Sequence, residues 1–216
     1  WGKTGWFECQ AGESFFRVFY KFLDTGEKND THFMVFYFMD RTDVEKAVKA
    51  CDEARPVFCL IRIDNVPEVT ADLTDVERSA LLSDVTEKVL SSFNAKEGFI
   101  KQYSTNDFVA CISHKALAEM MESNFEILDA VRAIHTVNRI PVTLSIGIVQ
   151  SSDSFMKQFE EAQVSLDLAL GRGGDQAIVR LGKEVKAFGG KSPTSVSSTR
   201  VRVRVVAQAL KEIIED

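Results

Sequence analysis

The first 40 residues contain one segment in which apolar and polar positions alternate and another that is almost entirely apolar. Residues 14–23 place Phe16, Val18 and Tyr20 on one side, and residues 32–39 are too aromatic to remain in water. Such segments, joined by polar turns, are typical of an antiparallel meander. Apolar residues at helical spacing follow the polar residues 40–43 and stop before Pro56. This pattern predicts a short helical linker over residues 41–55.

From residue 57 onward the pattern predicts strands and helices in turn. Residues 57–63 form a continuous apolar run, as expected of a strand buried on both faces. Thr74 and Glu77 have the spacing of a capping box. The helix behind it has an apolar face made of Val76, Ala80, Leu81, Val85, Val89 and Phe93. A second helix is predicted over about residues 115–138, with its clearest apolar stripe at Ile127, Leu128, Val131 and Ile134.

The last part of this region again alternates between strand and helix patterns. Pro141 begins a predicted strand in which Val142, Leu144, Ile146 and Ile148 alternate with small or polar residues. A helix over residues 155–170 turns Phe159, Ala162, Leu166, Ala169 and Leu170 inward and ends at Gly171. Residues 176–181 form the last clear strand. The order β-α-β-β-α-β-α-β predicts an α+β domain, ferredoxin-like or nucleotidyl-cyclase-like, with helices on a mainly antiparallel sheet.

The stretch from Phe99 to Ser113 is predicted as a β-hairpin with a polar tip at Ser104, Thr105, Asn106 and Asp107. Such side chains favour turns because they hydrogen-bond the local backbone. A tip on a rigid sheet is a common place for a ligand site. A solvated turn without a function is the alternative, and these residues alone favour it.

Composition narrows the function classes. The 216 residues carry a net charge of −6, with a pI near 5.2, which gives no support to a nucleic-acid partner. Four cysteines lie far apart and form no paired motif, as expected of free thiols in a reducing compartment. Three histidines show no metal-ligand spacing, and no apolar run reaches the length of a membrane helix. We therefore predict neither a metal ion nor another cofactor within these residues.

Several segments together resemble a GGDEF domain over about residues 55–182: the strand 57–63, the hairpin tip, TLSIGIV at 143–149 and ALGRGGDQAIVR at 169–180. The last segment, with FGGKS at 188–192 and TRVRVRVVAQAL at 199–210, is similar to the GdpP family of cyclic-di-AMP phosphodiesterases. In that family a membrane anchor, a PAS domain and a degenerate GGDEF domain precede the DHH and DHHA1 domains that perform the hydrolysis.

The resemblance implies four parts: the C-terminal strands of a PAS domain (1–40), a helical linker (41–55), a degenerate GGDEF domain (56–182) and a connector toward a DHH domain (183–216). The chain begins with Trp1 rather than Met, so we interpret it as a piece of a longer protein. The polar stretch 189–199 and an apolar stripe at Val203, Val206, Leu210 and Ile213 fit such a connector.

The resemblance also places the site. Residues 104–108 stand where the active signature has Gly, Gly, Asp, Glu and Phe, so Ser104 and Thr105 replace the glycines that let a triphosphate approach the backbone. Arg62 stands at the first position of the family's D-x-D pattern, where a carboxylate should bind metal, and Asp64 at the second. Diguanylate cyclase activity is therefore not expected. The candidate nucleotide-binding residues are Asp64, Asn65, Ser104, Thr105, Asn106 and Asp107.

Other motifs carry less weight. Gly173-Gly174-Asp175 spells GGD but lies between a predicted helix and a predicted strand, so we interpret it as a turn. Gly190-Lys191-Ser192 resembles the end of a P-loop, yet Val185 stands where its first glycine belongs. The arginines at 200, 202 and 204 could contact an anion or begin a solvated helix. Asp64 and Asn65 could bind a nucleotide or simply cap a turn.

The resemblance therefore implies a regulatory region of a membrane-anchored phosphodiesterase that converts cyclic-di-AMP to linear pApA in a downstream DHH domain, with Mn²⁺. These residues contain no DHH motif, would lie in the bacterial cytoplasm, and would not themselves be catalytic. They would sense a nucleotide (ATP, ppGpp or cyclic-di-AMP) or form a homodimer. The alternatives are weak ATP hydrolysis and a purely structural scaffold. Haem on the PAS domain is a family trait that no residue here identifies.

Overall fold

The computed structural model describes residues 4–24, 32–137, 139–150 and 154–189, and the statements below concern these residues. The chain divides into two compact units, Trp1–Ala54 and Arg55–Asp216, which are treated separately. Among the described helices, none combines the length and the apolar character that a bilayer crossing requires. The P-loop-like residues 190–192 and the predicted apolar stripe between residues 203 and 213 lie outside the described residues.

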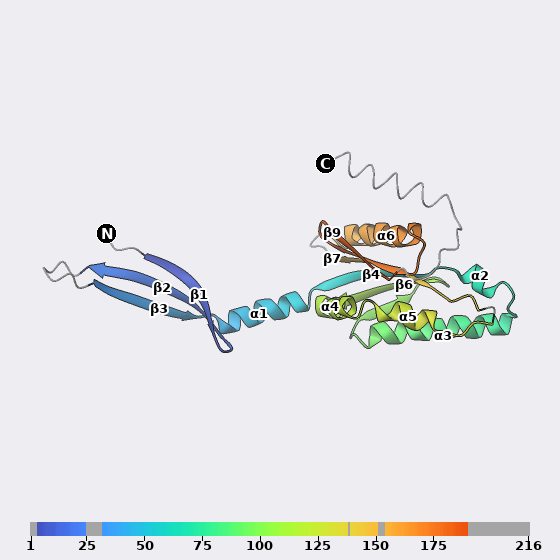
Figure 1. Ribbon diagram of the computed structural model, residues 1–216, viewed down its shortest axis with the longest axis horizontal. Helices are drawn as coiled ribbons and strands as arrows, with labels where there is room; N and C mark the ends of the chain where they lie inside the picture. The colour runs from blue at the N-terminus through green and yellow to red at the C-terminus, as the bar shows by residue number, and fades with distance from the viewer. Residues whose placement is uncertain (1–3, 25–31, 138, 151–153, 190–216) are drawn as a thin grey trace, which may run out of the picture. The chain divides into compact units, whose positions relative to one another are not determined.

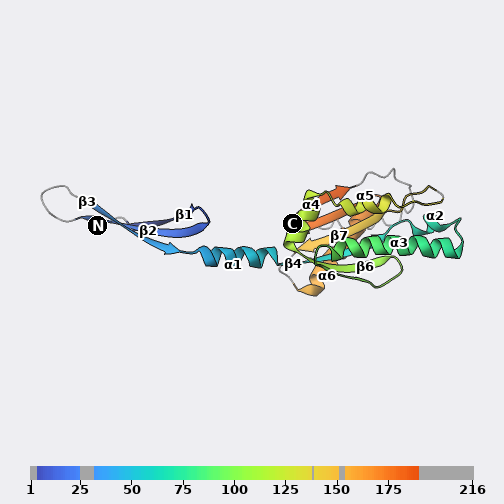
Figure 2. The same cartoon turned by 90° about the horizontal axis from the view of Figure 1, so that it is seen from below.

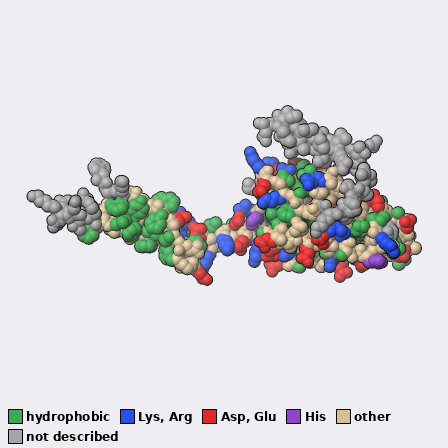
Figure 3. Space-filling view, viewed as in Figure 1, with side chains coloured by type: hydrophobic (Ala, Val, Ile, Leu, Met, Phe, Trp, Pro, Cys, Tyr) green, Lys and Arg blue, Asp and Glu red, His purple; other side chains and the backbone are tan. Residues whose placement is uncertain are grey.

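The first unit contains a three-stranded antiparallel sheet in the order β1-β2-β3, which confirms the predicted meander. Its elements are β1 Thr4–Ala11, β2 Ser14–Asp24, β3 His32–Asp40 and α1 Thr42–Glu53. Val18 is fully buried, but many aromatic side chains on the sheet remain exposed, among them Trp6, Tyr37 and Phe38. Figure 3 shows these apolar side chains gathered over the strands. The sheet therefore has an apolar surface that the described residues do not cover.

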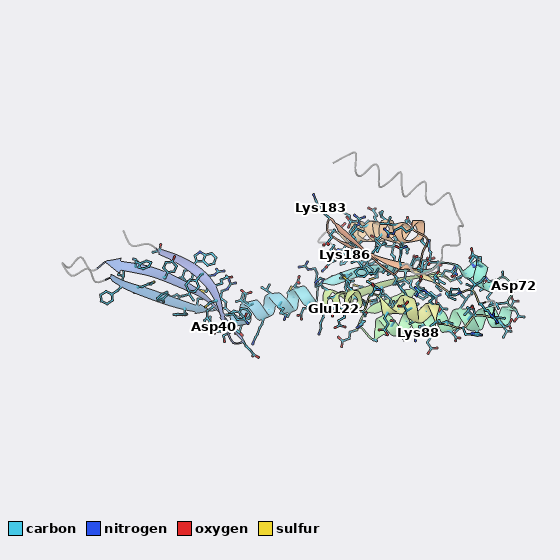
Figure 4. The ribbon with its side chains drawn as sticks, viewed as in Figure 1. Asp40, Asp72, Lys88, Glu122, Lys183 and Lys186 are labelled. Carbon is cyan, nitrogen blue, oxygen red and sulfur yellow. The ribbon has the colours of Figure 1, made fainter. Side chains whose placement is uncertain are left out.

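Helix α1 begins where the polar residues after β3 predict it. The Asp40 carboxylate accepts the backbone N–H of Thr42 at 2.8 Å, and the Thr42 hydroxyl accepts the N–H of Phe15 at 3.0 Å. Figure 4 labels Asp40 at this junction. The helix ends before Pro56, and none of its residues is buried in the described structure.

The second unit contains a six-stranded sheet in the order β5-β6-β4-β7-β8-β9, in which only β7 and β8 run parallel. Its strands are β4 Pro56–Ile63, β5 Phe99–Gln102, β6 Asp107–Ser113, β7 Leu144–Gln150, β8 Gln176–Leu181 and β9 Glu184–Gly189. Its helices are α2 Val66–Thr70, α3 Asp75–Asn94, α4 His114–Glu122, α5 Glu126–Arg132 and α6 Phe155–Gly171. Helices α3, α4 and α5 lie on one face of the sheet and α6 on the other (Figures 1 and 2). This arrangement confirms the predicted α+β class.

The core has two parts because β4 is covered on both sides. Cys59, Ile61 and Ile63 point into the larger cluster, which α3, α4 and α5 help to form. Leu60 belongs to a smaller cluster with Val149, Ala162, Leu166 and partly buried neighbours. The continuous apolar run of residues 57–63 is therefore a central strand buried on both faces, as predicted.

The capping box also forms as predicted: the Thr74 side chain accepts the N–H of Glu77, and the Glu77 carboxylate accepts the N–H of Thr74. The apolar face of α3 is shorter than expected, however. Val76 is 79% exposed and Ala80 is exposed as well, whereas the other members of the face, Leu81, Val85, Val89 and Phe93, are buried. The first turn and a half of α3 therefore extends beyond the sheet, where no partner covers it within the described part of the chain.

The prediction of one continuous helix over about residues 115–138 is wrong. It is two helices, α4 and α5, separated by Ser123, Asn124 and Phe125. Asn124 and Phe125 have positive φ values of 53° and 54°, and the N–H of Phe125 donates to the carbonyl of Met120 at 2.8 Å. The turn places the Phe125 side chain in the core, where it is 1% exposed. Core packing thus overrides the helical pattern here.

Three further boundaries differ from those expected. The strand predicted from Pro141 begins at Leu144, because residues 141–143 are held by side-chain contacts instead. Phe159 is 42% exposed and lies edge-on to Phe58 rather than in the interior. Strand β9 pairs antiparallel with β8 inside the segment assigned to a connector, so the sheet continues to Gly189. Figure 4 marks this hairpin by Lys183 and Lys186.

Close packing of α6 on β7 gives a test of the fold. A side chain at Gly147 would place its Cβ 2.3 Å from the carbonyl oxygen of Ala162 and 2.4 Å from the nitrogen of Leu166. Because helix backbone cannot yield there, we expect Gly147→Ala to lower the free energy of unfolding by about 3 kcal/mol. Gly182→Ala has open space but a φ of +60°, so it should cost only about 1 kcal/mol. Urea denaturation of the two variants measures both, and equal stabilities would contradict this packing.

Candidate functional site

The predicted hairpin is confirmed, and its tip is closed by its own polar groups. Strands β5 and β6 pair from Phe99 to Gln102, and residues 103–106 form the turn. The N–H groups of Tyr103 and Ser104 both donate to the backbone carbonyl of Asp107, at 3.1 and 3.4 Å. The Gln102 side-chain amide donates to the carbonyl of Thr105 at 2.9 Å. These bonds therefore hold the tip against the start of β6.

An ion pair joins Arg62 on β4 to Asp107 on β6. The two residues are direct partners in the antiparallel pairing, and Arg62 Nε donates to Asp107 Oδ1 at 2.6 Å. The Ser104 hydroxyl donates to the other oxygen, Oδ2, at 2.8 Å. Both carboxylate oxygens are thus already bonded within the protein. The arginine side chain is 36% exposed and the aspartate 15%.

Arg62 therefore lies against the carboxylate that the family pattern would use for a divalent ion. A guanidinium group repels a metal cation and offers it no oxygen ligand. Within the described ranges, no group of three or more histidine, cysteine, aspartate or glutamate side chains could hold a metal ion. The residues present do not fit the metal site of an active GGDEF domain.

Asp64 follows β4 directly, and the turn between α6 and β8 binds its side chain. Its Oδ2 accepts the N–H of Asp175 at 2.9 Å. Its Oδ1 is buried, and the side chains of Ser145 and Thr143 lie close enough to the carboxyl to oppose a rise in its pKa. Burial raises the pKa of Asp64 to about 6, although the N–H of Asp175 opposes this shift. A Cβ at Gly174 would approach Asp64 Oδ2 to 2.6 Å at a φ of +76°, so the close contact depends on glycine.

The Gly173-Gly174-Asp175 segment is the predicted turn from helix to strand, and all three residues have positive φ values. Sequence reasoning missed the role of its aspartate. Asp175 is 2% exposed, and Arg132 Nη2 donates to both of its carboxylate oxygens, at 2.6 and 2.7 Å. Arg132 on α5 also pairs with Asp129. A buried charge is stable when it is paired in this way, so the turn is anchored to α5 and β4 together.

The remaining candidates have different surroundings. Asn65 donates to the carbonyl of Pro141 at 2.8 Å and accepts the N–H of Thr143 at 3.2 Å, so it holds the segment that precedes β7. The carbonyl of Asn106 accepts the N–H of Ile63 at 2.9 Å, while its buried side-chain oxygen has no partner in the described structure. The structure therefore gathers Asp64, Ser104, Asn106 and Asp107 at one end of the sheet and gives Asn65 a structural contact.

Solved structures define the class of this domain. A diguanylate cyclase/phosphodiesterase from Caldicellulosiruptor saccharolyticus superposes with a TM-score of 0.51 at 10% identity, covering 66% of this chain and 90% of that one. The active GGEEF domain of a diguanylate cyclase from Vibrio cholerae gives 0.50 at 12% identity, covering 65% and 90%. At such low identities the likeness concerns the fold, which is that of a GGDEF domain.

Sequence comparison identifies the family. The model for the GGDEF domain of cyclic-di-AMP phosphodiesterases of the GdpP type matches residues 61–187, and the chain belongs to this family. It is 38% identical over 181 residues to the cyclic-di-AMP phosphodiesterase PdeA of Listeria monocytogenes and 39% identical over 184 residues to GdpP of Bacillus subtilis. These alignments cover 83% and 84% of this chain but 28% of each relative.

The raised pKa of Asp64 predicts how stability depends on pH. Between pH 4 and 6 the folded state keeps the Asp64 proton while the unfolded state has lost it, so this group lowers stability as pH rises through that window. Asp64→Asn keeps an acceptor for the N–H of Asp175 but cannot ionise. As pH rises from 4 to 7, the free energy of unfolding of the unsubstituted protein should fall by about 2 kcal/mol relative to that of the variant, since one pKa unit is worth ~1.4 kcal/mol.

Urea midpoints across this range, recorded for both proteins, measure the difference. Parallel stability curves would show that Asp64 titrates normally and is not buried as described.

Proposed function

We propose that the chain is the regulatory region of a cyclic-di-AMP phosphodiesterase. The family membership and the names of the curated relatives support this proposal. The chain spans 28% of those relatives. We assign the hydrolysis itself to a part of the protein outside these residues. A downstream DHH/DHHA1 region with Mn²⁺ would cut cyclic-di-AMP to linear pApA. A membrane anchor outside these residues would hold the protein at the bacterial membrane, with the domains described here in the cytoplasm.

Within that protein we assign to the GGDEF domain the sensing of a nucleotide without its conversion. The ion pair between Arg62 and Asp107 carries this assignment. Two-metal phosphoryl transfer needs carboxylates that are free to coordinate, whereas Asp107 is bonded at both oxygens. Ser104 and Thr105 at the polar tip are exposed and remain accessible for recognition. ATP, ppGpp and cyclic-di-AMP are the candidate ligands. Weak ATP hydrolysis is the second candidate, and the same ion pair argues against it.

The first unit suggests a structural role that accompanies sensing. Its exposed aromatic strands would form the C-terminal part of a PAS domain, completed by residues outside the chain. Helix α1, which has no buried residue, would then link that domain to the GGDEF domain. A homodimer is the assembly that we expect, and a domain that only dimerises is the alternative to a sensor. No described residue is assigned to haem, and no nucleic acid is expected as a partner.

A thermal-shift titration of the chain with ATP, GTP, ppGpp and cyclic-di-AMP tests the sensing role. A ligand that binds only the folded state adds ~2.7 kcal/mol of stability at a hundredfold excess over its dissociation constant. We expect such a shift for at least one ligand, its loss in Asp107→Ala, and its retention in the matched control Asp84→Ala on α3. The chain alone should not hydrolyse cyclic-di-AMP. Absence of any shift would favour the scaffold, with concentration-dependent dimerisation as its signature in sedimentation.

A single substitution should restore part of the lost metal site. Arg62→Asp would place a second carboxylate directly across from Asp107 on β4 and β6, and hard divalent ions bind such oxygen pairs. We expect Mn²⁺ to raise the melting temperature of this variant and to leave the unsubstituted protein unchanged. Arg62→Asn, which lacks the charge, is the control. An equal Mn²⁺ shift in the unsubstituted protein would mean that Arg62 does not exclude the ion.

A further inference from the structure

We propose that Arg62 replaces a divalent metal as the positive charge of this site, so that the domain binds the phosphate group of its ligand without metal. This inference rests on the proposed nucleotide sensing and states how the ligand is held. It concerns the end of the sheet where Asp107 on β6, Arg62 on β4 and Ser145 on β7 form one row of direct strand partners.

The first argument is the way in which Arg62 is bonded. Its contact with Asp107 uses Nε, and within the described ranges its two Nη atoms enter no hydrogen bond or ion pair. Asp107 therefore orients the guanidinium plane while leaving the outer edge of the fork free. Two Nη groups in one plane match the oxygens of a phosphate, and such charge-assisted pairs are stronger than neutral hydrogen bonds. A side chain that is 36% exposed is accessible to a ligand.

The second argument is that the neighbouring carboxylates are already neutralised or buried. Asp107 is less exposed than Arg62, and its second oxygen is bonded to Ser104. The carboxylate of Asp175 is enclosed and paired with Arg132. The guanidinium of Arg62 is therefore the charge in this row most exposed to solvent, and an anion can approach it.

The third argument is what a divalent ion would require at this place. Such an ion needs several oxygen ligands, and it would have to displace Arg62 from Asp107. Ser145, the third member of the row, is fully buried and its hydroxyl lies beside the Asp64 carboxyl, so it offers the ion no accessible ligand.

Calorimetric titration of the full 216-residue chain with ATP and with pyrophosphate tests the inference, in excess EDTA and in Mn²⁺. We expect EDTA to leave the affinity unchanged. Arg62→Gln should weaken binding of both probes at least about tenfold, the loss expected for a charge-assisted hydrogen bond. Arg78→Gln, which removes an exposed arginine on α3, should bind as the unsubstituted protein does. Arg62→Lys keeps the charge but not the fork, so its affinity should be intermediate.

The outcomes separate this inference from the function on which it rests. Binding that disappears in EDTA, or that Arg62→Gln leaves unaffected, overturns metal-free phosphate recognition by Arg62 while nucleotide sensing stands. Failure of both probes to bind, with and without Mn²⁺, overturns phosphate recognition by Arg62. Nucleotide sensing is overturned with it, leaving the scaffold, when the thermal-shift titration with ppGpp and cyclic-di-AMP is negative as well. If Arg62→Gln does not fold, the EDTA titration of the unsubstituted protein and the Arg62→Lys variant still decide.

Discussion

Burial of β4 on both faces is the constraint from which the architecture of the domain follows. The strand is paired with β6 on one side and β7 on the other, and helices cover it above and below. A polar side chain in the middle of such a strand would be desolvated without a partner, which is costly. Charged residues can therefore occur only where the strand leaves the sheet, and they do so at Arg62 and Asp64. The position of the candidate site is thus a consequence of the core.

Two separate ion pairs make the end of the sheet rigid. Arg62 and Asp107 join β4 to the hairpin, while Arg132 and Asp175 join α5 to the turn after α6. The N–H of Asp175 then reaches Asp64, so the second pair is linked to the same strand as the first. Removing one partner of a buried pair leaves an uncompensated charge, which is why such pairs fix geometry even when they add little net stability. Recognition at this end would therefore need little rearrangement.

Local pattern was sufficient for the features that depend on neighbours in sequence: the capping box at Thr74, the hairpin and the turn at Gly173. It failed where distant residues decide. The predicted helix runs through Asn124, yet packing of Phe125 in the core imposes a left-handed turn at two residues that are not glycine. Likewise, Asp175 and Arg132 are 43 positions apart, so their pairing depends on a topology that spacing alone does not reveal. The candidate site was predicted from its hairpin, whereas the Arg132–Asp175 pair at the same end of the sheet was not predicted.

An arginine at a position where active GGDEF domains have a metal ligand would alter the chemistry of the site more than its location in the fold. Two-metal phosphoryl transfer needs divalent ions that stabilise both the attacking and the leaving oxygen, whereas recognition needs only one cation in a fixed position. A guanidinium held by Asp107 meets the second requirement and not the first. A guanidinium carries one positive charge, whereas a divalent ion carries two. It would therefore neutralise less of the negative charge of a polyphosphate, which should dissociate faster than from a metal-containing site. A site of this kind would report ligand concentration independently of the supply of divalent ions, which suits a sensor better than an enzyme.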